Sequence, residues 1–263
     1  MILSHRVALN GVQLDSVDNR ILIQGVDEAA GKDQVSAVGV FGGVGQRITN
    51  QRRDYLDVTV RFSLKIHKDN MQARSDVFEK VNAWAAPGGW LTVNYKAGRR
   101  LRVVRYQCPA AGDQWAWTSV YSITFLAYAV PYWQQATATE YTATGSSASI
   151  SATVLGSEKS RLDVTFKNNS SSACATFSIT AGGSTIALAN LALAKNETLH
   201  IDHTEDGLLR IRIQNTSNVY RSALDKRTAE SSDDLWVSPG PVAITMTAQR
   251  TGTLTVKSAG WFA

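Results

Sequence analysis

The chain has 263 residues, of which 44% are hydrophobic and 19% are charged, and its formal net charge is +5. This composition excludes a disordered chain and allows one large β domain or two ordinary ones. No stretch approaches the about 18 consecutive apolar residues of a membrane helix, so we expect no membrane insertion. The N-terminus lacks a basic region followed by a long apolar one, so we expect no signal peptide and synthesis in a cytoplasm.

The first recognisable element is a glycine-rich stretch that leads into a strongly alternating one. Residues 27–54 are weakly periodic and are interpreted as a long loop or an extended hairpin. In residues 55–66 large apolar side chains alternate strictly with polar ones, which predicts a long, half-buried antiparallel strand. Its apolar positions are Leu56, Val58, Val60, Phe62, Leu64 and Ile66. The other face, which carries Asp57, Thr59, Arg61, Ser63 and Lys65, is expected to meet water or a neighbouring subunit.

The period then changes to that of a helix. Asp69 stands in N-cap position with Gln72 three residues later, which is capping-box spacing. Pro87 and two glycines end the pattern. The apolar stripe consists of Met71, Val77, Phe78, Val81, Trp84 and Ala85. This is the single helix that the sequence predicts, and its stripe favours packing on a sheet over binding a cofactor.

Strands follow for the rest of the chain. A hairpin turning at residues 96–99 and an aromatic strand at 115–130 complete the first half. Pro131 ends the first domain because proline cannot donate to a continuing ladder. Residues 137–185 are rich in Ser and Thr, and the second half is interpreted as a β-sandwich of short strands. These strands are expected within 161–168, 175–183, 184–193, 197–202, 208–215, 242–248 and 252–262.

Side chains that could carry chemistry are few. Cys108 and Cys174 are interpreted as reduced, buried residues without a disulfide. The densest group of potential metal ligands is His200, Asp202, His203, Glu205 and Asp206. Its spacing fits no established zinc pattern, and a strand places its two histidines on opposite faces, so an acidic turn is favoured over a metal site.

No catalytic residue, cofactor site or metal site is therefore predicted, and we expect no enzyme. Trp236 and Trp261 could stack on a sugar ring, but a structural position at a strand edge is favoured for both. A wall-degrading hydrolase would need a carboxylate or metal cluster, and activity lost on His203→Ala would revive that alternative.

Positive charge is concentrated in one region. Residues 46–105 hold 13 Lys or Arg and 5 Asp or Glu, a local balance of +8 that exceeds the excess of the whole chain. Such a bias is found on nucleic-acid surfaces. A solvated or subunit-facing surface, balanced by acids elsewhere in the chain, is favoured instead.

The order of elements in the first half resembles the distal tail proteins of long-tailed, non-contractile (siphovirus-like) bacteriophages. The resemblance rests on the 55–66 strand, the helix core at 77–84, the hairpin arm at 99–105 with Tyr106, and "AVPYW" at 129–133. In the second half it rests more loosely on "LHID" at 199–202, "LWVSPG" at 235–240 and the terminal tryptophan.

The resemblance implies a mainly β protein of two domains. Residues 1–133 would form a ring-building, tail-tube-like β-sandwich with one flanking α-helix, and 134–263 a peripheral, galectin-like β-sandwich. Pro131, Tyr132 and Trp133 would form the joint between them. In the family, a hexameric ring at the virion tail tip connects the tail tube to the tail-tip hub or receptor-binding proteins. The chain would be made in the host's bacterial cytoplasm.

The resemblance also gives an expectation for the subunit interface: Arg52, Arg53, Asp57, Arg61, Lys65, Arg99 and Arg100. The resemblance implies that DNA would pass through the ring without specific binding. Since a conduit should not hold its cargo by phosphate contacts, the four arginines of this set other than Arg61 are expected to face neighbours or solvent.

Other functions stay open at this point. Gln214-Asn215-Thr216 and the charged segment 220–233 depart from the family's pattern, so the partners of the outer domain are undetermined. The alternatives are a carbohydrate-binding or adhesive β-sandwich module, and a tube or baseplate subunit of a contractile particle. Loss of glycan binding on Trp236→Ala would favour the adhesive module.

Overall fold

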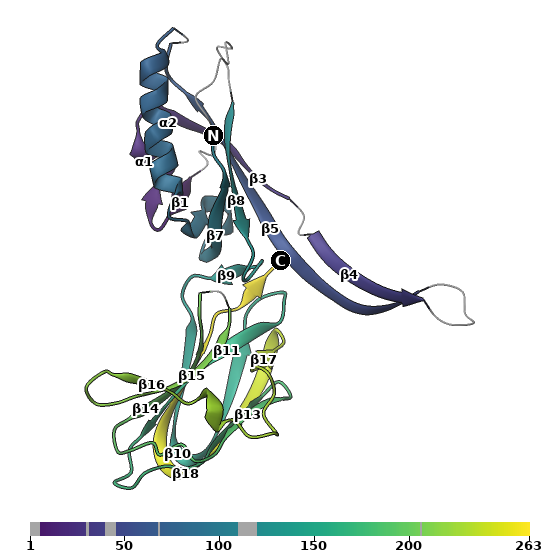
Figure 1. Ribbon diagram of the computed structural model, residues 1–263, viewed down its shortest axis with the longest axis vertical. Helices are drawn as coiled ribbons and strands as arrows, with labels where there is room; N and C mark the ends of the chain where they lie inside the picture. Colours follow the sequence, from purple (N-terminus) through teal and green to yellow (C-terminus); the bar gives the residue numbers. More distant parts are fainter. Residues whose placement is uncertain (1–5, 30–31, 40–45, 68, 110–119, 206) are drawn as a thin grey trace. The chain divides into compact units, whose positions relative to one another are not determined.

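The computed structural model describes residues 6–29, 32–39, 46–67, 69–109, 120–205 and 207–263, and it describes the side chains of these residues except at 32–34, 38–39 and 46–52. The chain forms two compact units, Met1–Trp133 and Gln134–Ala263. Both are built mainly from β-strands (Figure 1).

In unit 1 the strands hydrogen-bond in the order β2-β1-β6-β7-β8-β5-β3. Neighbours are antiparallel throughout this order. The strands are β1 (Val7–Leu9), β2 (Val12–Gln13), β3 (Ile21–Glu28), β4 (Lys32–Gly39), β5 (Gln46–Leu64), β6 (Gly89–Val93), β7 (Arg99–Gln107) and β8 (Tyr121–Ala127). The short strand β9 (Trp133–Gln135) lies at the boundary of the units.

Strand β5 follows the alternation of its sequence. Leu56, Val58, Val60 and Phe62 are buried, while Arg61 between them is exposed. The apolar parity weakens toward the end, because Leu64 is only half-buried. The strand is longer than the predicted 55–66 because it begins at Gln46.

Helix α2 (Met71–Ala85) covers one face of this sheet (Figure 1). The Phe78 and Tyr121 rings meet edge-on with centroids 4.7 Å apart, so the apolar stripe packs on the sheet as predicted. The cap was assigned one residue too early. Asn70, not Asp69, is the N-cap, since its Oδ1 accepts the backbone N–H of Ala73 at 3.0 Å.

Beyond the predicted helix, the described part of the chain contains three further turns of helix. These are α1 (Leu14–Val17) and the 3₁₀ turns η1 (Asn94–Lys96) and η2 (Leu224–Lys226). Each is only three or four residues long, which is too short for a periodic pattern to reveal in sequence.

The glycine-rich entry contains an extended hairpin, the second of the two possibilities that the sequence left open. Among the described strands, β4 pairs only with β5, from Lys32 opposite Tyr55 to Gly39 opposite Gln46. In β5, pairing with β8 begins only at Leu56 and pairing with β3 only at Val58. The first half of β5 and β4 therefore form a two-stranded ribbon beyond the sheet (Figure 1).

In unit 2 two long strands, β10 and β18, run side by side through both halves of one sheet. β10 pairs with β18 along almost its whole length. The first half of β18 also pairs with β12, and the second half with β11. The strands of this unit are β10 (Thr139–Val154), β11 (Ser160–Asn168), β12 (Phe177–Ala181), β13 (Ser184–Leu188), β14 (Thr198–His203), β15 (Leu209–Gln214), β16 (Tyr220–Ser222), β17 (Trp236–Val237), β18 (Gly240–Ser258) and β19 (Trp261–Phe262).

Glycines stand where β10 and β18 change register. The pairing shifts between Gly145 and Ser147, and Gly252 lies opposite Gly145. A Cβ on Gly252 would lie 2.4 Å from the Lys167 carbonyl oxygen and from the Phe166 ring. No side chain fits there, so glycine is required for the close approach of β18 to β11.

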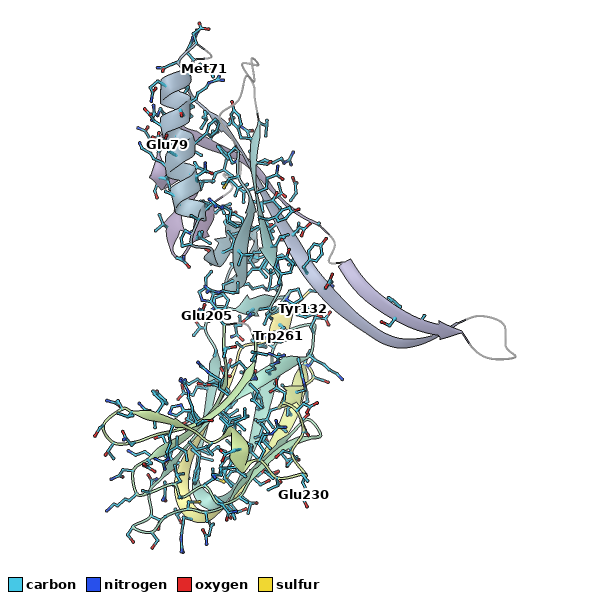
Figure 2. All side chains as sticks on the ribbon, in the orientation of Figure 1. Met71, Glu79, Tyr132, Glu205, Glu230 and Trp261 are labelled. Atoms are coloured by element: carbon cyan, nitrogen blue, oxygen red, sulfur yellow. The ribbon has the colours of Figure 1, made fainter. Side chains whose placement is uncertain are left out.

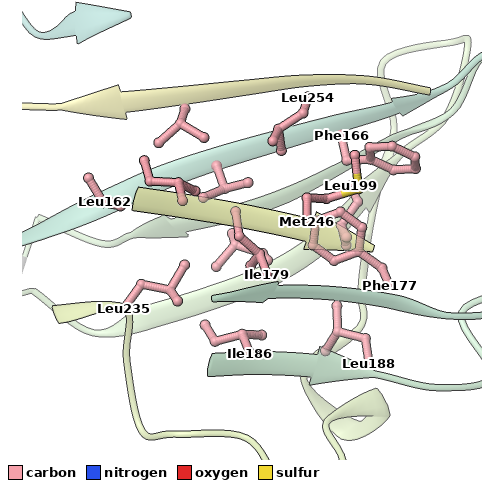
Figure 3. Close-up of a cluster of buried hydrophobic side chains, with 14 of the residues drawn as sticks. Leu162, Phe166, Phe177, Ile179, Ile186, Leu188, Leu199, Leu235, Met246 and Leu254 are labelled. Atoms are coloured by element: carbon pink, nitrogen blue, oxygen red, sulfur yellow. The ribbon is translucent and has the colours of Figure 1, made fainter. Parts of the chain in front are cut away.

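The two halves of the unit 2 sheet enclose one apolar core (Figure 3). Phe177, Ile179 and Met246 come from one half, and Phe166 and Leu254 come from the other. The Phe166 and Phe177 rings lie 5.0 Å apart and join the halves. Burial of these alternating positions supplies the main stabilisation of the unit.

The sequence divided this unit differently in two places. The strands predicted at 242–248 and 252–262 are one continuous strand, β18, followed by β19. The 16-residue strand β10 was not predicted, although it is one of the longest in the protein. Its residues are mostly Ser, Thr, Ala and Gly, so the contrast between its two faces is weak.

Candidate assembly interface

Arg61 lies on the outer face of the unit 1 sheet, where it pairs with an acid of the neighbouring strand. Its Nε is 2.6 Å from Asp27 Oδ2, and its Nη2 donates to Asp27 Oδ1 at 3.0 Å. Both side chains are about half exposed, so the pair itself contributes little stability. It presents one charge of each sign toward anything that covers this face.

Asp57 and Lys65 share the outer parity of β5 with Arg61, as the alternation predicted. Lys65 is exposed at the end of the strand. Asp57 is half-buried, and no residue of the described chain donates a hydrogen bond to its Oδ1. Of these three side chains, Lys65 and the paired Arg61 are exposed.

Arg99 and Arg100 are neighbours on β7 and therefore point to opposite faces of the sheet. The Arg100 guanidinium lies over the Trp90 ring at 4.0 Å, and Arg102 lies over the same ring at 5.9 Å. Burial lowers the pKa of Arg100, whose Nε receives no acceptor from the described residues. The two residues predicted as a pair thus do not form one patch.

Arg53 is half-buried and lies against the last residues of unit 1. Its guanidinium lies 5.0 Å from the centroid of the Tyr132 ring. The backbone of Arg52 lies in the ribbon opposite Gln34, and its side chain is outside the described part of the chain.

The three residues of the expected joint are anchored within unit 1. Pro131 and Trp133 are buried, and Tyr132 (labelled in Figure 2) is half-buried beneath Arg53. Trp133 is fully enclosed, and Lys96 lies 4.9 Å from its ring. The residue at the end of unit 1 is therefore held by packing and by a cation–π contact.

Glu28 holds this anchor, and sequence reasoning missed it. Its Oε2 accepts the indole N–H of Trp133 at 3.0 Å and the ammonium of Lys96 at 2.7 Å, and Tyr95 donates to Oε1 at 2.7 Å. Burial and the hydrogen bond to this carboxylate raise the pKa of Tyr95. A buried tryptophan N–H needs an acceptor, which is the signal that could have prompted a search for an acid.

In unit 2, His203 is clamped between two carboxylates. Its Nδ1 lies 2.9 Å from Asp163 Oδ1, and its Nε2 lies 2.9 Å from Asp234 Oδ1. Although burial alone would lower it, these two hydrogen bonds raise the pKa of His203 to about 9. Both ring nitrogens thus carry protons near neutral pH, which leaves no lone pair to bind a metal.

The remaining members of that histidine and acid cluster serve other contacts. Asp202 accepts hydrogen bonds from Arg210 and Arg212, and His200 binds Gln214. The chain turns after β14, where Gly207 donates to the Thr204 carbonyl. Asp206 lies outside the described residues, and those described contain no group of three or more ligands that could hold a metal ion.

Trp236 lies in a stack of its own unit. The Arg161 guanidinium is 4.5 Å from its ring centroid, and the Trp261 ring meets it edge-on at 5.8 Å. Arg161 is also ion-paired with Asp234 at 2.9 Å. Arg161 thereby covers one face of the Trp236 ring, and both contacts hold the ring within unit 2.

Both cysteines are free thiols, with Cys174 buried and Cys108 half-buried. Burial raises the pKa of Cys108 despite the nearby Arg105. Among the described residues, no helix has the length and apolar character needed to cross a bilayer.

No protein-family model matches the sequence, and no curated protein matches it. Solved structures do. The SPP1 Dit (gp 19.1) protein, described as a paradigm of the hub adsorption apparatus in phages that infect Gram-positive bacteria, superimposes with a TM-score of 0.66 at 11% identity. The match covers 97% of this chain and 98% of that one.

The chain has the fold of SPP1 Dit. The similarity to distal tail proteins that the order of elements indicated is thus confirmed at the level of the fold, across both units.

Two structures of the phage P2 baseplate in its activated conformation, one with Ca and one with Sr, give TM-scores of 0.46 and 0.45 at 7% and 6% identity. The first match covers 100% of both chains, and the second covers 96% of this chain and 97% of that one.

Proposed function

We propose that the protein is a structural hub of a phage tail tip, which forms a hexameric ring between the tail tube and the host-adsorption apparatus and lets DNA pass. The observation that carries the proposal is the fold shared with SPP1 Dit over nearly the full length of both chains.

The shape of unit 1 supports assembly. Its β4–β5 ribbon makes no pairing with the rest of the described sheet. A two-stranded ribbon is marginal in water by itself, because its groups bury little apolar surface. A neighbouring subunit that receives the ribbon would supply the missing contacts.

The charges of unit 1 suit such a neighbour better than they suit DNA. Arg61 is neutralised by Asp27, and Arg100 and Arg53 lie over aromatic rings. Arginines engaged in this way neutralise few phosphates, so the affinity for passing DNA would be low. Lys65 remains as an exposed cation on the same face as the paired Arg61.

The proposal is tested by the mass of the full chain in light scattering at low and high salt, together with negatively stained images. We expect a hexameric species seen as rings. Lys65→Glu should shift the population toward smaller species, because it reverses a charge at the proposed interface. The matched control is Lys195→Glu, the same change at an exposed position of unit 2, which should leave the ring intact.

The outcomes test separately whether a ring forms and whether the Lys65 face is its subunit interface. A single-chain species at every concentration, without rings in the images, would overturn the proposal. Rings that tolerate Lys65→Glu as well as they tolerate Lys195→Glu would place the interface elsewhere on unit 1.

A further inference from the structure

Strand β10 lies at an edge of both halves of the unit 2 sheet. Its ladder partner is β18, and no other described strand pairs with it. The strand runs for 16 residues, where about 5–6 is typical, and a long unpaired edge invites pairing with another strand. Its backbone groups on the side away from β18 are therefore available for hydrogen bonding.

The identity of these groups follows from one contact. Thr153 donates its backbone N–H to the Tyr141 hydroxyl at 3.0 Å, and that hydroxyl donates to the Thr153 carbonyl at 2.9 Å. Thr153 lies opposite Pro241, which has no N–H to give. Thr153 thus directs both backbone groups away from β18.

Alternation along the strand then sets the others. From Ser147 to Val154 the register with β18 is continuous, so Ser151, Ser149 and Ser147 share the orientation of Thr153. All three serines are exposed, and no described residue forms a hydrogen bond with their outward backbone groups. Of these four residues, only Thr153 has its outward backbone groups bonded by another described residue.

This edge lacks the usual protection along its open stretch. The bulge at Gly145 limits it at one end, and the Tyr141 hydroxyl closes it at the other. Between Tyr141 and Val154 there is no charged residue and no proline, the two residue types that keep natural edges apart.

The side chains of the stretch are complementary to themselves. The serines continue a row of hydroxyl groups that crosses the sheet from Ser149 to Thr245 and Thr180. Thr180 and Thr185 already share a hydrogen bond of 2.9 Å across this row. A second β10 in antiparallel orientation would set hydroxyl opposite hydroxyl and bring no like charges together.

We propose that β10 pairs with β10 of a second copy of the chain about a two-fold axis, with Ser149 opposite Ser151 of the second copy. These residues then exchange their outward N–H and C=O groups, and Ile150 lies opposite itself on the core side. The two unit 2 sheets become one continuous sheet through this edge.

The contact between two chains is small, well below the about 1,000 Å² of a stable interface, so an isolated pair is weak. A two-fold contact of this kind cannot join neighbours within a cyclic six-fold ring, so it joins two rings. Several such pairs then form at once between the rings, and their effective concentration makes the joint association much tighter. The pairing therefore acts on top of whatever assembly unit 1 directs.

The test is sedimentation velocity of the full chain over a wide concentration range, for the wild type, Ser149→Pro and Ser149→Lys. Proline removes an outward N–H without breaking a bond to β18, and lysine adds the charge that the edge lacks. We expect the wild-type mass to double as concentration rises, and both variants to raise the midpoint concentration at least about tenfold.

The matched control is Ser178→Lys, which adds the same charge to the same hydroxyl face but on the interior strand β12. It should associate like the wild type. Absence of doubling, doubling that survives both Ser149 variants, or an equal effect of Ser178→Lys would overturn the proposal. Failure of the proposed ring would be seen separately. Lys65→Glu tests contacts of unit 1 within a ring, whereas the Ser149 variants should halve the mass and leave each ring closed.

Discussion

His203 should make the stability of unit 2 depend on pH in the alkaline range. The group is about nine-tenths enclosed between Asp163 and Asp234, and its pKa is raised to about 9. In the unfolded chain a histidine titrates near about 6.5. Because the folded pKa lies above the unfolded one, the stabilisation is complete below about pH 6.5 and is lost as pH rises through about 9.

The magnitude follows from the difference between these pKa values. Each pKa unit corresponds to about 1.4 kcal/mol, so the shift sets an upper value of roughly 3 kcal/mol. Asp163 is about half exposed, so solvent screens its share of the interaction. We therefore expect about 2 kcal/mol to be lost from the free energy of unfolding of unit 2 between about pH 6 and 10.

The assay is calorimetric unfolding of the wild type and His203→Gln over this pH range, with the imidazole titration followed by NMR. The variant lacks the titrating group, so its unfolding free energy should fall less with pH, by about 2 kcal/mol. His200→Gln serves as the control, since His200 binds Gln214 and leaves the clamp around His203 intact. Parallel pH profiles for wild type and His203→Gln, or titration of His203 near about 6.5, would refute the reasoning.

One substitution in each unit tests its packing by denaturant unfolding. Glu28→Ala leaves the Lys96 ammonium and the Trp133 N–H without their acceptor. It should lower the free energy of unfolding of unit 1 by about 3 kcal/mol and shift the tryptophan emission. The control Asp27→Ala breaks only an exposed pair and should cost less than about 1 kcal/mol, so equal losses would contradict the role of Glu28. Gly252→Ala should cost unit 2 about 3 kcal/mol, because its methyl group overlaps β11, and a neutral result would exclude the close approach of the strands.

Local patterns were sufficient where one element alternates against one core. The buried parity of Val58, Val60 and Phe62 and the stripe of α2 both came from side-chain periodicity, which depends only on backbone geometry. The same reasoning placed Arg61 and Lys65 on the outer face of β5. It could not separate the cap residue Asn70 from Asp69, since both side chains can accept a backbone N–H.

The interface set shows where such patterns stop. Charge content grouped Arg99 with Arg100, but adjacent strand residues face opposite ways, and Arg100 lies against Trp90. Whether an arginine side chain is available at the surface depends on which aromatic ring or carboxylate of another strand lies beside it. That partner lies far away in sequence, so no local signal marks it.

The sequence by itself therefore determined the β character, the single long helix and the resemblance in the order of elements, because these depend on periodicity and on residues that break it. Only the tertiary structure decided that Glu28 holds Trp133, that His203 joins Asp163 to Asp234, and that β10 is a long edge strand. Each of these depends on a pairing between distant segments or on weak contrast between the faces of a strand. Such features are set by the free energy of the whole fold and not by neighbouring residues.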